Sequence, residues 1–135
     1  MPVFETESDR EKQDALGWVL ESIGFDVEQT STLSAFDFKL YRHGRPYALV
    51  EYKARDKLWD PLKVDTQKIR QLVYAAREFG GKPIFIVGCP GPPYHFIQPH
   101  TDYEVTMFKR ERGSDTRGDT EKEVFMIPAS EFNLL

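Results

Sequence analysis

The sequence predicts an α/β chain in which helices flank a mixed central sheet, with the order α-β-β-β-α-β and extra strands near the C-terminus. Two short apolar runs, residues 36–41 and 47–53, are joined by His43-Gly44-Arg45-Pro46. Amphipathic segments precede and follow this pair, and an almost wholly apolar run comes next, at residues 83–88. A chain of 135 residues is most simply one domain, residues 1–135.

The first helix is expected over residues 9–24, with Ser8 or Asp9 as its N-cap and Gly24 as its end. Its apolar positions recur at helical spacing: Ala15, Leu16, Val19, Leu20 and Ile23. A first strand lies within residues 25–32, and the two apolar runs then form a β-hairpin.

The second helix is expected to begin at Asp60-Pro61, with the aspartate as cap and the proline in the first turn, and to end before Gly80. Residues 83–88 should form a strand in the middle of the sheet, because an apolar run of this kind is buried on both faces.

Residues 94–97 and 103–108 are expected to extend the same sheet. Residues 94–97, 103–108 and 124–128 are predicted as strands, and the charged, Gly-, Ser- and Thr-rich residues 109–123 as a mobile loop or hairpin tip.

The hairpin brings charged side chains together. Gly44 lies midway between Asp37 and Glu51, so a hairpin folded about it places the two carboxylates opposite each other, with Cβ atoms roughly 4.5–5.5 Å apart. Side chains alternate along a strand, so Lys53 shares the face of Glu51. A slip of half a residue at the turn would instead pair Asp37 with Tyr52, and a bulge could produce or repair that slip.

Facing carboxylates destabilise a sheet unless a cation offsets them, and ligands that are all oxygen favour Mg²⁺ or Mn²⁺. Such an ion acidifies water and neutralises charge on a phosphate, while a nearby lysine orients the water, so the cluster indicates phosphodiester hydrolysis. The alternative is a structural protein in which Lys53 bridges Asp37 and Glu51 as an ion pair.

Asp37 followed by Glu51-Tyr52-Lys53 resembles the D…(D/E)-x-K signature of the PD-(D/E)XK nuclease superfamily, whose fold is restriction-endonuclease-like. Residues 36–91 look most like the N-terminal nuclease domain of type I restriction R subunits and like small phage or resolvase-type nucleases. The resemblance implies a nuclease with Asp37, Glu51 and the Tyr52 carbonyl as metal ligands and Lys53 as a catalytic residue.

Two features depart from the family pattern: the spacing within a helix motif, and the residues Ala35-Phe36, which stand where the family has a proline before its first acid. The family's helix motif spaces its glutamine and tyrosine one residue further apart than Gln71 and Tyr74, which leaves Gln67 as a rival for the catalytic role expected of Gln71. Related nucleases often carry a third acid on the first helix, and Glu11 lies nearer the apolar stripe than Glu21, although a surface role for Glu11 is the simpler reading.

The net charge of −4 hides a sharp division along the chain: residues 1–37 carry −7, residues 38–82 carry +6 and residues 83–135 carry −3. The basic part contains the cluster. A DNA-phosphate surface is expected from Lys39, Arg42, Arg45, Lys53, Arg55, Lys57, Lys63, Lys68 and Arg70, with ordinary solvated faces of strand and helix as the alternative. The contacts assigned to it are Arg55, Lys57, Lys63, Gln67 and Arg70. Trp59 is expected to pack under the second helix, with stacking on an unpaired base as the alternative.

The sequence contains no apolar run of roughly 20 residues and no signal-peptide pattern, and its single cysteine fits a reducing compartment, so a cytoplasmic location without a membrane is expected. The expected partner is DNA, duplex or branched. A homodimer, with residues 125–135 as its interface, or a larger nuclease complex would let the protein cut both strands. The alternative function is a catalytically silent module of the same fold that binds nucleic acid or a partner.

Overall fold

The computed structural model describes residues 7–30, 34, 36–88, 93–110 and 120–135. The helices are α1 (Glu7–Ser22), α2 (Thr66–Phe79) and the short 3-10 helix η1 (Ala129–Glu131). The strands are β1 (Asp26–Gln29), β2 (Phe38–Arg42), β3 (Arg45–Ala54), β4 (Leu62–Asp65), β5 (Lys82–Gly88), β6 (Tyr94–Ile97), β7 (Glu104–Arg110), β8 (Thr120–Ile127) and β9 (Asn133–Leu134).

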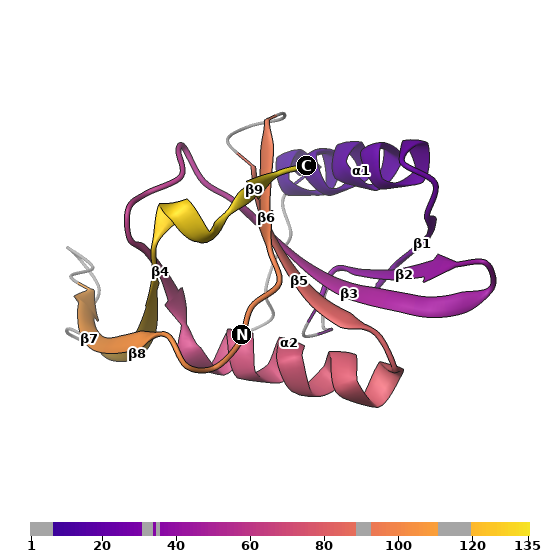
Figure 1. Ribbon diagram of the computed structural model, residues 1–135. Helices are drawn as coiled ribbons and strands as arrows, with labels where there is room; N and C mark the ends of the chain where they lie inside the picture. Colours follow the sequence, from indigo (N-terminus) through magenta and orange to yellow (C-terminus); the bar gives the residue numbers. More distant parts are fainter. Residues whose placement is uncertain (1–6, 31–33, 35, 89–92, 111–119) are drawn as a thin grey trace.

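The central sheet has the strand order β1-β2-β3-β5-β6-β9. Its β3 and β5 pair in parallel and its other neighbours pair antiparallel, so the sheet is mixed. Helices α1 and α2 cover its two opposite faces (Figure 1). The predicted fold class, including a central position for β5, is therefore confirmed.

Alternating side chains of β3 divide the core between the two helices. Ala48, Val50 and Tyr52 pack with Leu16 and Leu20 of α1. On the other face, Leu49 packs with Ile69, Leu72 and Ala76 of α2, among other residues. Since Glu51 and Lys53 follow the parity of Leu49, they lie on the α2 side of the sheet, and the expected separation of Glu51 and Lys53 from Val50 and Tyr52 is confirmed.

The hairpin turn is two residues long, because Arg42 pairs with Arg45. His43 and Gly44 have φ values of 53° and 73°, as the tight hairpin turns with two left-handed residues require. A bulge between Leu40 and Tyr41 then shifts the register, so that Phe38 faces Val50. The paired residues of this register end at Phe38 and Val50, and the Asp37 N–H also donates to the Val50 carbonyl. Direct pairing of Asp37 with Glu51 therefore stays a prediction, although the two carboxyl groups lie close enough for the Asp37 charge to raise the pKa of Glu51.

Both helices begin at places other than those predicted. α1 already includes Ser8 and Asp9, which were expected to cap it. The predicted start of α2 at Asp60-Pro61, a cis peptide bond, is also wrong, because residues 62–65 form β4. The helix is instead capped by Asp65, whose side chain accepts a hydrogen bond from the Gln67 backbone N–H at 2.9 Å. Neither α1 nor α2 is long and apolar enough to cross a membrane, and no other described segment is such a helix.

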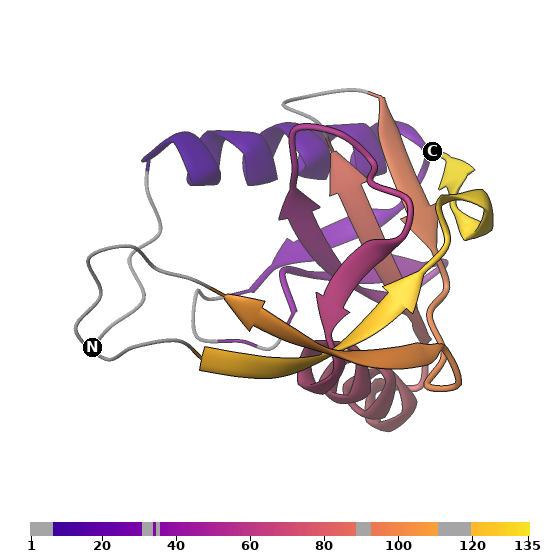
Figure 2. The same cartoon turned by 90° about the vertical axis from the view of Figure 1, so that its left-hand side faces the viewer.

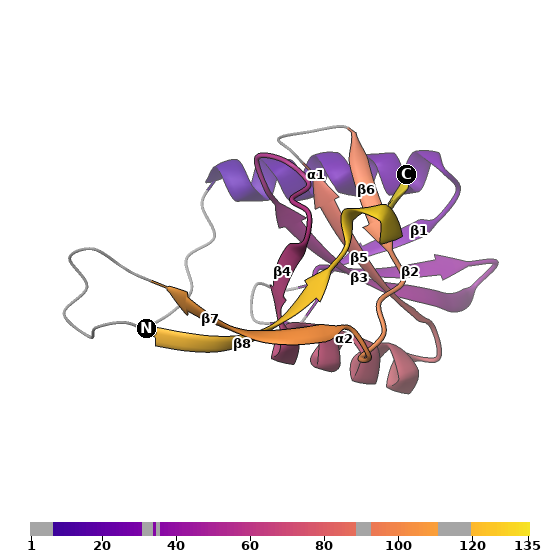
Figure 3. The ribbon, with the colours of Figure 1, turned by 60° about the vertical axis from the view of Figure 1, so that its left-hand side comes forward.

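Strand β6 extends the central sheet as predicted. Strand β7 does not, and neither does β8. They form a second sheet of order β4-β8-β7, which lies beside α2 (Figure 2) and projects away from the rest of the molecule (Figure 3). The predicted loop over residues 109–123 is partly strand, since Lys109 pairs with Glu121 and Arg110 with Thr120, and residues 111–119 lie outside the described part.

The second sheet also corrects the expected interface. Phe125 and Ile127 are fully buried and pack against Leu62 and Val64 of β4 in the core of the same chain, so these two side chains are not available to a second copy. In residues 125–135, the large apolar side chains that remain exposed are Leu134 and Leu135, at the β9 edge of the central sheet.

Candidate active site

Asp37 stands directly before β2, and its main chain is held from both sides. Its backbone N–H donates to the Val50 carbonyl of β3 at 2.7 Å, and its carbonyl accepts from the Thr30 N–H, just after β1, at 2.9 Å. Because both neighbours fix the backbone, the carboxylate leaves the sheet at a defined point.

The Asp37 carboxylate accepts hydrogen bonds from two other elements. Its Oδ2 accepts from the Tyr52 backbone N–H of β3 at 2.7 Å, and its Oδ1 accepts from Nε2 of Gln13 on α1 at 3.1 Å. The Gln13 amide is itself oriented, since its Oε1 accepts from Nε2 of Gln29 on β1 at 3.1 Å. Donors to a carboxylate stabilise its ionised form and fix its direction.

Glu51 lies inside β3 and is only 8% exposed. Two ammonium groups approach the same carboxylate oxygen: the Oε1 atom is 3.7 Å from Nζ of Lys53 and 3.9 Å from Nζ of Lys68 on α2. Both distances exceed those of a hydrogen bond, so the contacts are ion pairs held by charge rather than by close geometry.

The electrostatics of Glu51 are those of a carboxyl group that has lost its water. Burial and, to a smaller extent, the nearby Asp37 charge raise the pKa of Glu51 from 4.5 to about 7, against the opposing effects of Lys53 and Lys68. The combined pKa remains high because one buried acid beside another cannot ionise cheaply. A cation placed between the two acids would reverse this cost.

The ammonium group of Lys53 is perturbed in the opposite sense. Burial, the neighbouring Lys68 and, to a smaller extent, Arg55 lower its pKa from 10.5 to about 8, against the opposing effect of the Glu51 charge. In the protein as it stands, the surroundings thus favour the neutral forms of both Glu51 and Lys53. Such opposed shifts in one cluster are typical of a functional site.

The donor set available to a metal ion is small. Within the described part of the chain, no three His, Cys, Asp or Glu side chains converge. The cluster offers two carboxylates, Asp37 and Glu51, next to the main chain of Tyr52. One or two carboxylates, completed by water and substrate phosphate, are how Mg²⁺ is usually held.

The basic residues assigned to DNA are found in different settings. Arg55 and Lys57 are exposed in the segment after β3, and Lys63 is exposed on β4 with its Nζ 5.0 Å from the Phe108 ring. Arg70 is not open in the same way, since its guanidinium is 3.2 Å from the Glu123 carboxylate of β8.

Trp59 does not pack under α2 as expected. Its side chain is 51% exposed, and Nζ of Lys57 lies 3.9 Å from the centre of its ring. The segment that carries it is anchored, because Asp60 Oδ1 accepts a hydrogen bond from the Ala129 N–H at 3.1 Å. The exposed ring therefore fits the alternative, stacking on a base.

The two glutamines expected on the second helix are both exposed on α2. Gln67 is in the first turn, and Gln71 lies one turn beyond Lys68. On α1, Glu11 is exposed, and Gln13 is the residue that reaches Asp37. The side chain of α1 that contacts Asp37 is thus the amide of Gln13 and not a third acid.

Two residues of the cluster were not assigned to it from the sequence, Gln13 and Lys68, although the sequence held a signal for each. Gln13 precedes Leu16 and Leu20 by three and seven residues, so it is a polar residue in the buried stripe of α1. Lys68 lies directly beside the buried Ile69, at the border of the apolar face of α2.

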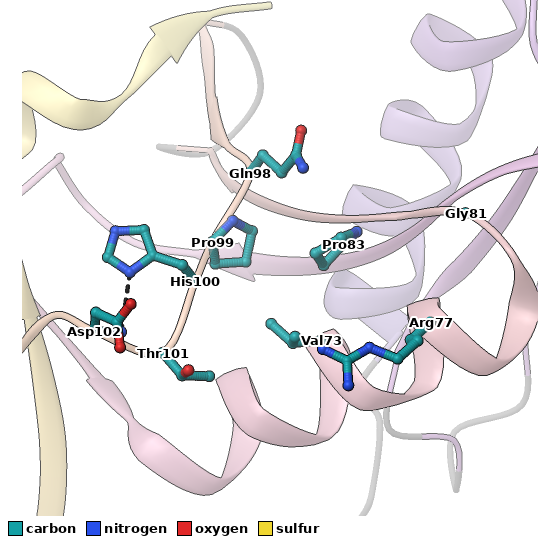
Figure 4. A pocket seen from close by; sticks show the side chains of 9 residues that line it. All are labelled: Val73, Arg77, Gly81, Pro83, Gln98, Pro99, His100, Thr101 and Asp102. Atoms are coloured by element: carbon teal, nitrogen blue, oxygen red, sulfur yellow. Dashed lines mark hydrogen bonds between the residues drawn. The ribbon is translucent and has the colours of Figure 1, made fainter.

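An open hollow of about 410 Å³ lies elsewhere on the molecule (Figure 4). It is lined by Val73 and Arg77, from the later part of α2, and by the segment after β6, where the Asp102 N–H donates to His100 Nδ1 at 3.0 Å. None of the residues of the acidic cluster lines it. This hollow is therefore separate from the cluster.

Comparisons with known proteins bear on the fold and on the family of the chain. A Holliday junction resolvase from the archaeal hyperthermophile Archaeoglobus fulgidus, Hjc, has a similar structure, with a TM-score of 0.62 and 23% sequence identity over 90% of this chain and 84% of the resolvase. At this identity the likeness shows the fold. No curated protein matches the sequence. Residues 1–135 match the family described as "Phage putative PDDEXK endonuclease", and the chain belongs to this family of PD-(D/E)XK nucleases.

Proposed function

We propose that this nuclease cleaves DNA with the help of a divalent cation, at a centre formed by Asp37, Glu51 and Lys53. One observation carries the proposal: a buried carboxyl group with a pKa of about 7 lies beside a second acid and a lysine. Two neighbouring acids that disfavour each other's ionisation would cost stability in a purely structural cluster, whereas a bound cation would offset their negative charge.

The residues present fit Mg²⁺ or Mn²⁺. Asp37 and Glu51 would hold the ion with their carboxylates, and Tyr52 with its main-chain carbonyl, and the ligand set would consist of oxygen atoms alone. Such a cation lowers the pKa of water and offsets charge on a phosphate. The hydrogen bonds from Gln13 and the Tyr52 N–H would keep Asp37 directed at this ion.

Lys53 would position the attacking water. In the reaction the water oxygen forms a bond to phosphorus while a bond from phosphorus to a sugar oxygen breaks, and the proton lost by the water and the proton gained by the sugar oxygen exchange with solvent. The Lys53 side chain is 26% exposed and lies 3.7 Å from Glu51, so it reaches the solvent side of the cluster where such a water would lie. Gln71, or Gln67, would assist from α2.

The DNA would follow the basic part of the chain. Arg55 and Lys57 are exposed in the segment after β3 and Lys63 is exposed on β4, and Gln67 would add a polar contact from the first turn of α2. Arg70 would contribute only if it left Glu123. A Holliday junction resolvase shares the fold, which makes a four-way junction a substrate to include beside simple duplexes. Cutting of both strands would require two centres, in a homodimer or a larger nuclease complex.

A cleavage assay tests the proposal. Purified wild type and Lys53→Ala would be incubated with supercoiled, linear, single-stranded and four-way-junction DNA in Mg²⁺, Mn²⁺ or EDTA, with Lys82→Ala as the control. Lys82 is an exposed lysine at the first position of β5, and its Nζ lies 5.1 Å from the centre of the Tyr47 ring. We expect metal-dependent cutting by wild type and Lys82→Ala, and none by Lys53→Ala. If wild type cuts none of these DNAs, the proposal is wrong, and the catalytically silent binding module on the same fold becomes the favoured alternative.

A further inference from the structure

We propose that Lys68 is a further catalytic residue, which binds a nonbridging oxygen of the phosphate that is cleaved. The inference rests on the proposed function. Lys68 comes from α2 and Lys53 from β3, yet their Nζ atoms lie 3.9 Å and 3.7 Å from the same oxygen of Glu51. Two cations from different elements meet at one carboxylate.

The position of Lys68 is fixed by the helix that carries it. Ile69 and Leu72 are fully buried against the sheet, and Asp65 caps the helix three residues before Lys68. The backbone of Lys68 therefore cannot shift without disturbing the core. Its neighbour on α2, Arg70, is directed elsewhere, because the Glu123 carboxylate lies 3.2 Å away.

The two lysines differ in exposure. The side chain of Lys53 is 26% exposed and that of Lys68 is 47% exposed. Lys68 therefore covers the cluster from the solvent side, which is the side from which a DNA backbone must approach. An ammonium group on a flexible stem that is half in solvent can move from Glu51 to a phosphate oxygen without breaking a tight hydrogen bond.

The charges of the cluster give the reason for a second lysine. Asp37 and Glu51 balance Lys53 and Lys68, so a centre that also holds a divalent cation carries two positive charges. The phosphorus group carries two negative charges in the transition state of hydrolysis, one more than the intact diester. Without Lys68 the centre would fall one positive charge short. Lys68 acts by this charge and exchanges no proton.

Cleavage kinetics test the inference. Lys68→Ala is expected to lower kcat about 100-fold, the size of effect seen when one donor to a developing oxyanion is removed, and to raise KM by a smaller factor because one phosphate contact is lost. Lys68→Arg should retain part of the rate, and Lys82→Ala should match wild type. If wild type cuts DNA and Lys68→Ala cuts it equally well, the inference fails while the proposed function stands. If wild type cuts no DNA, both fail.

Two further measurements separate a phosphate contact from a structural role. In EDTA, without cleavage, the slope of log K for a short duplex against log salt should fall by about 1 in Lys68→Ala and remain unchanged in Lys82→Ala. Calorimetric titration with Mn²⁺ should show no loss of affinity in Lys68→Ala. An unchanged salt slope, or Mn²⁺ binding weakened as much as cleavage, would mean that Lys68 only holds Glu51 in place, and would overturn the inference.

Discussion

Replacement of Glu51 by glutamine should stabilise the metal-free protein. Glu51 is 8% exposed, and its pKa is raised from 4.5 to about 7, mainly by burial and then by Asp37. The folded state therefore holds a proton over a pH range in which the unfolded chain has released it, and stability falls as the pH rises through this range. Glutamine keeps nearly the same shape and carries no charge, so it removes this dependence.

The magnitude follows from the two pKa values. Each pH unit between them is worth about 1.4 kcal/mol, so ionised Glu51 costs about 3 kcal/mol at pH 8 and less than about 1 kcal/mol at pH 5. The attraction of Lys53 and Lys68 is already contained in the pKa. We expect Glu51→Gln to raise the free energy of unfolding by about 3 kcal/mol at pH 8 in EDTA, and to have a small effect at pH 5.

Urea unfolding at pH 5 and pH 8 measures this difference. Glu28→Gln is a suitable control, because Glu28 is an exposed carboxylate whose Oε2 lies 3.6 Å from Nζ of Lys39, and such surface pairs contribute about 0–1 kcal/mol. Mg²⁺ or Mn²⁺ should stabilise wild type and not Glu51→Gln. A Glu51→Gln variant that is no more stable than wild type at pH 8, or equally stabilised at both pH values, would refute the reasoning.

Three other substitutions test separate parts of the structure. Gln13→Ala removes a hydrogen bond to Asp37 and should weaken Mn²⁺ binding about 10-fold in calorimetry, and unchanged affinity would show that Gln13 does not orient the acid. In a Trp18→Phe variant, whose remaining tryptophan is Trp59, single-stranded DNA should quench the fluorescence even in EDTA, and a constant signal would speak against base stacking. Gly81→Ala would place a Cβ 2.8 Å from the Tyr47 carbonyl, so a loss of about 1–3 kcal/mol is expected in urea unfolding, and a neutral result would mean that β3 yields easily there.

The parts of the fold that depend on local patterns could be predicted from the sequence. The hairpin follows from a turn with Gly44 between apolar runs, and the alternation that sets Glu51 and Lys53 on one face is a property of any strand. The central position of β5 could be predicted because a strand that is buried on both faces is an almost continuous apolar run. These features need no information from distant residues.

Strand β4 could not be predicted in this way. Asp60-Pro61 has the composition of a helix start, and four residues are too few for a strand pattern to outweigh it. The pairing that makes residues 62–65 a strand comes from β8, at the far end of the chain. The same distant pairing removed Phe125 and Ile127 from the surface and separated β7 and β8 from the central sheet.

The site shows the same limit at the level of single side chains. The hairpin supplies Asp37 and Glu51, and these could be identified because both lie on one local element. Gln13 and Lys68 reach the acids only because α1 and α2 dock on opposite faces of the sheet, and no spacing in the sequence states how the helices dock. A change that loosens either helix would therefore disturb the centre even while the hairpin remained folded. Loss of activity at temperatures below global unfolding would be the consequence of that arrangement.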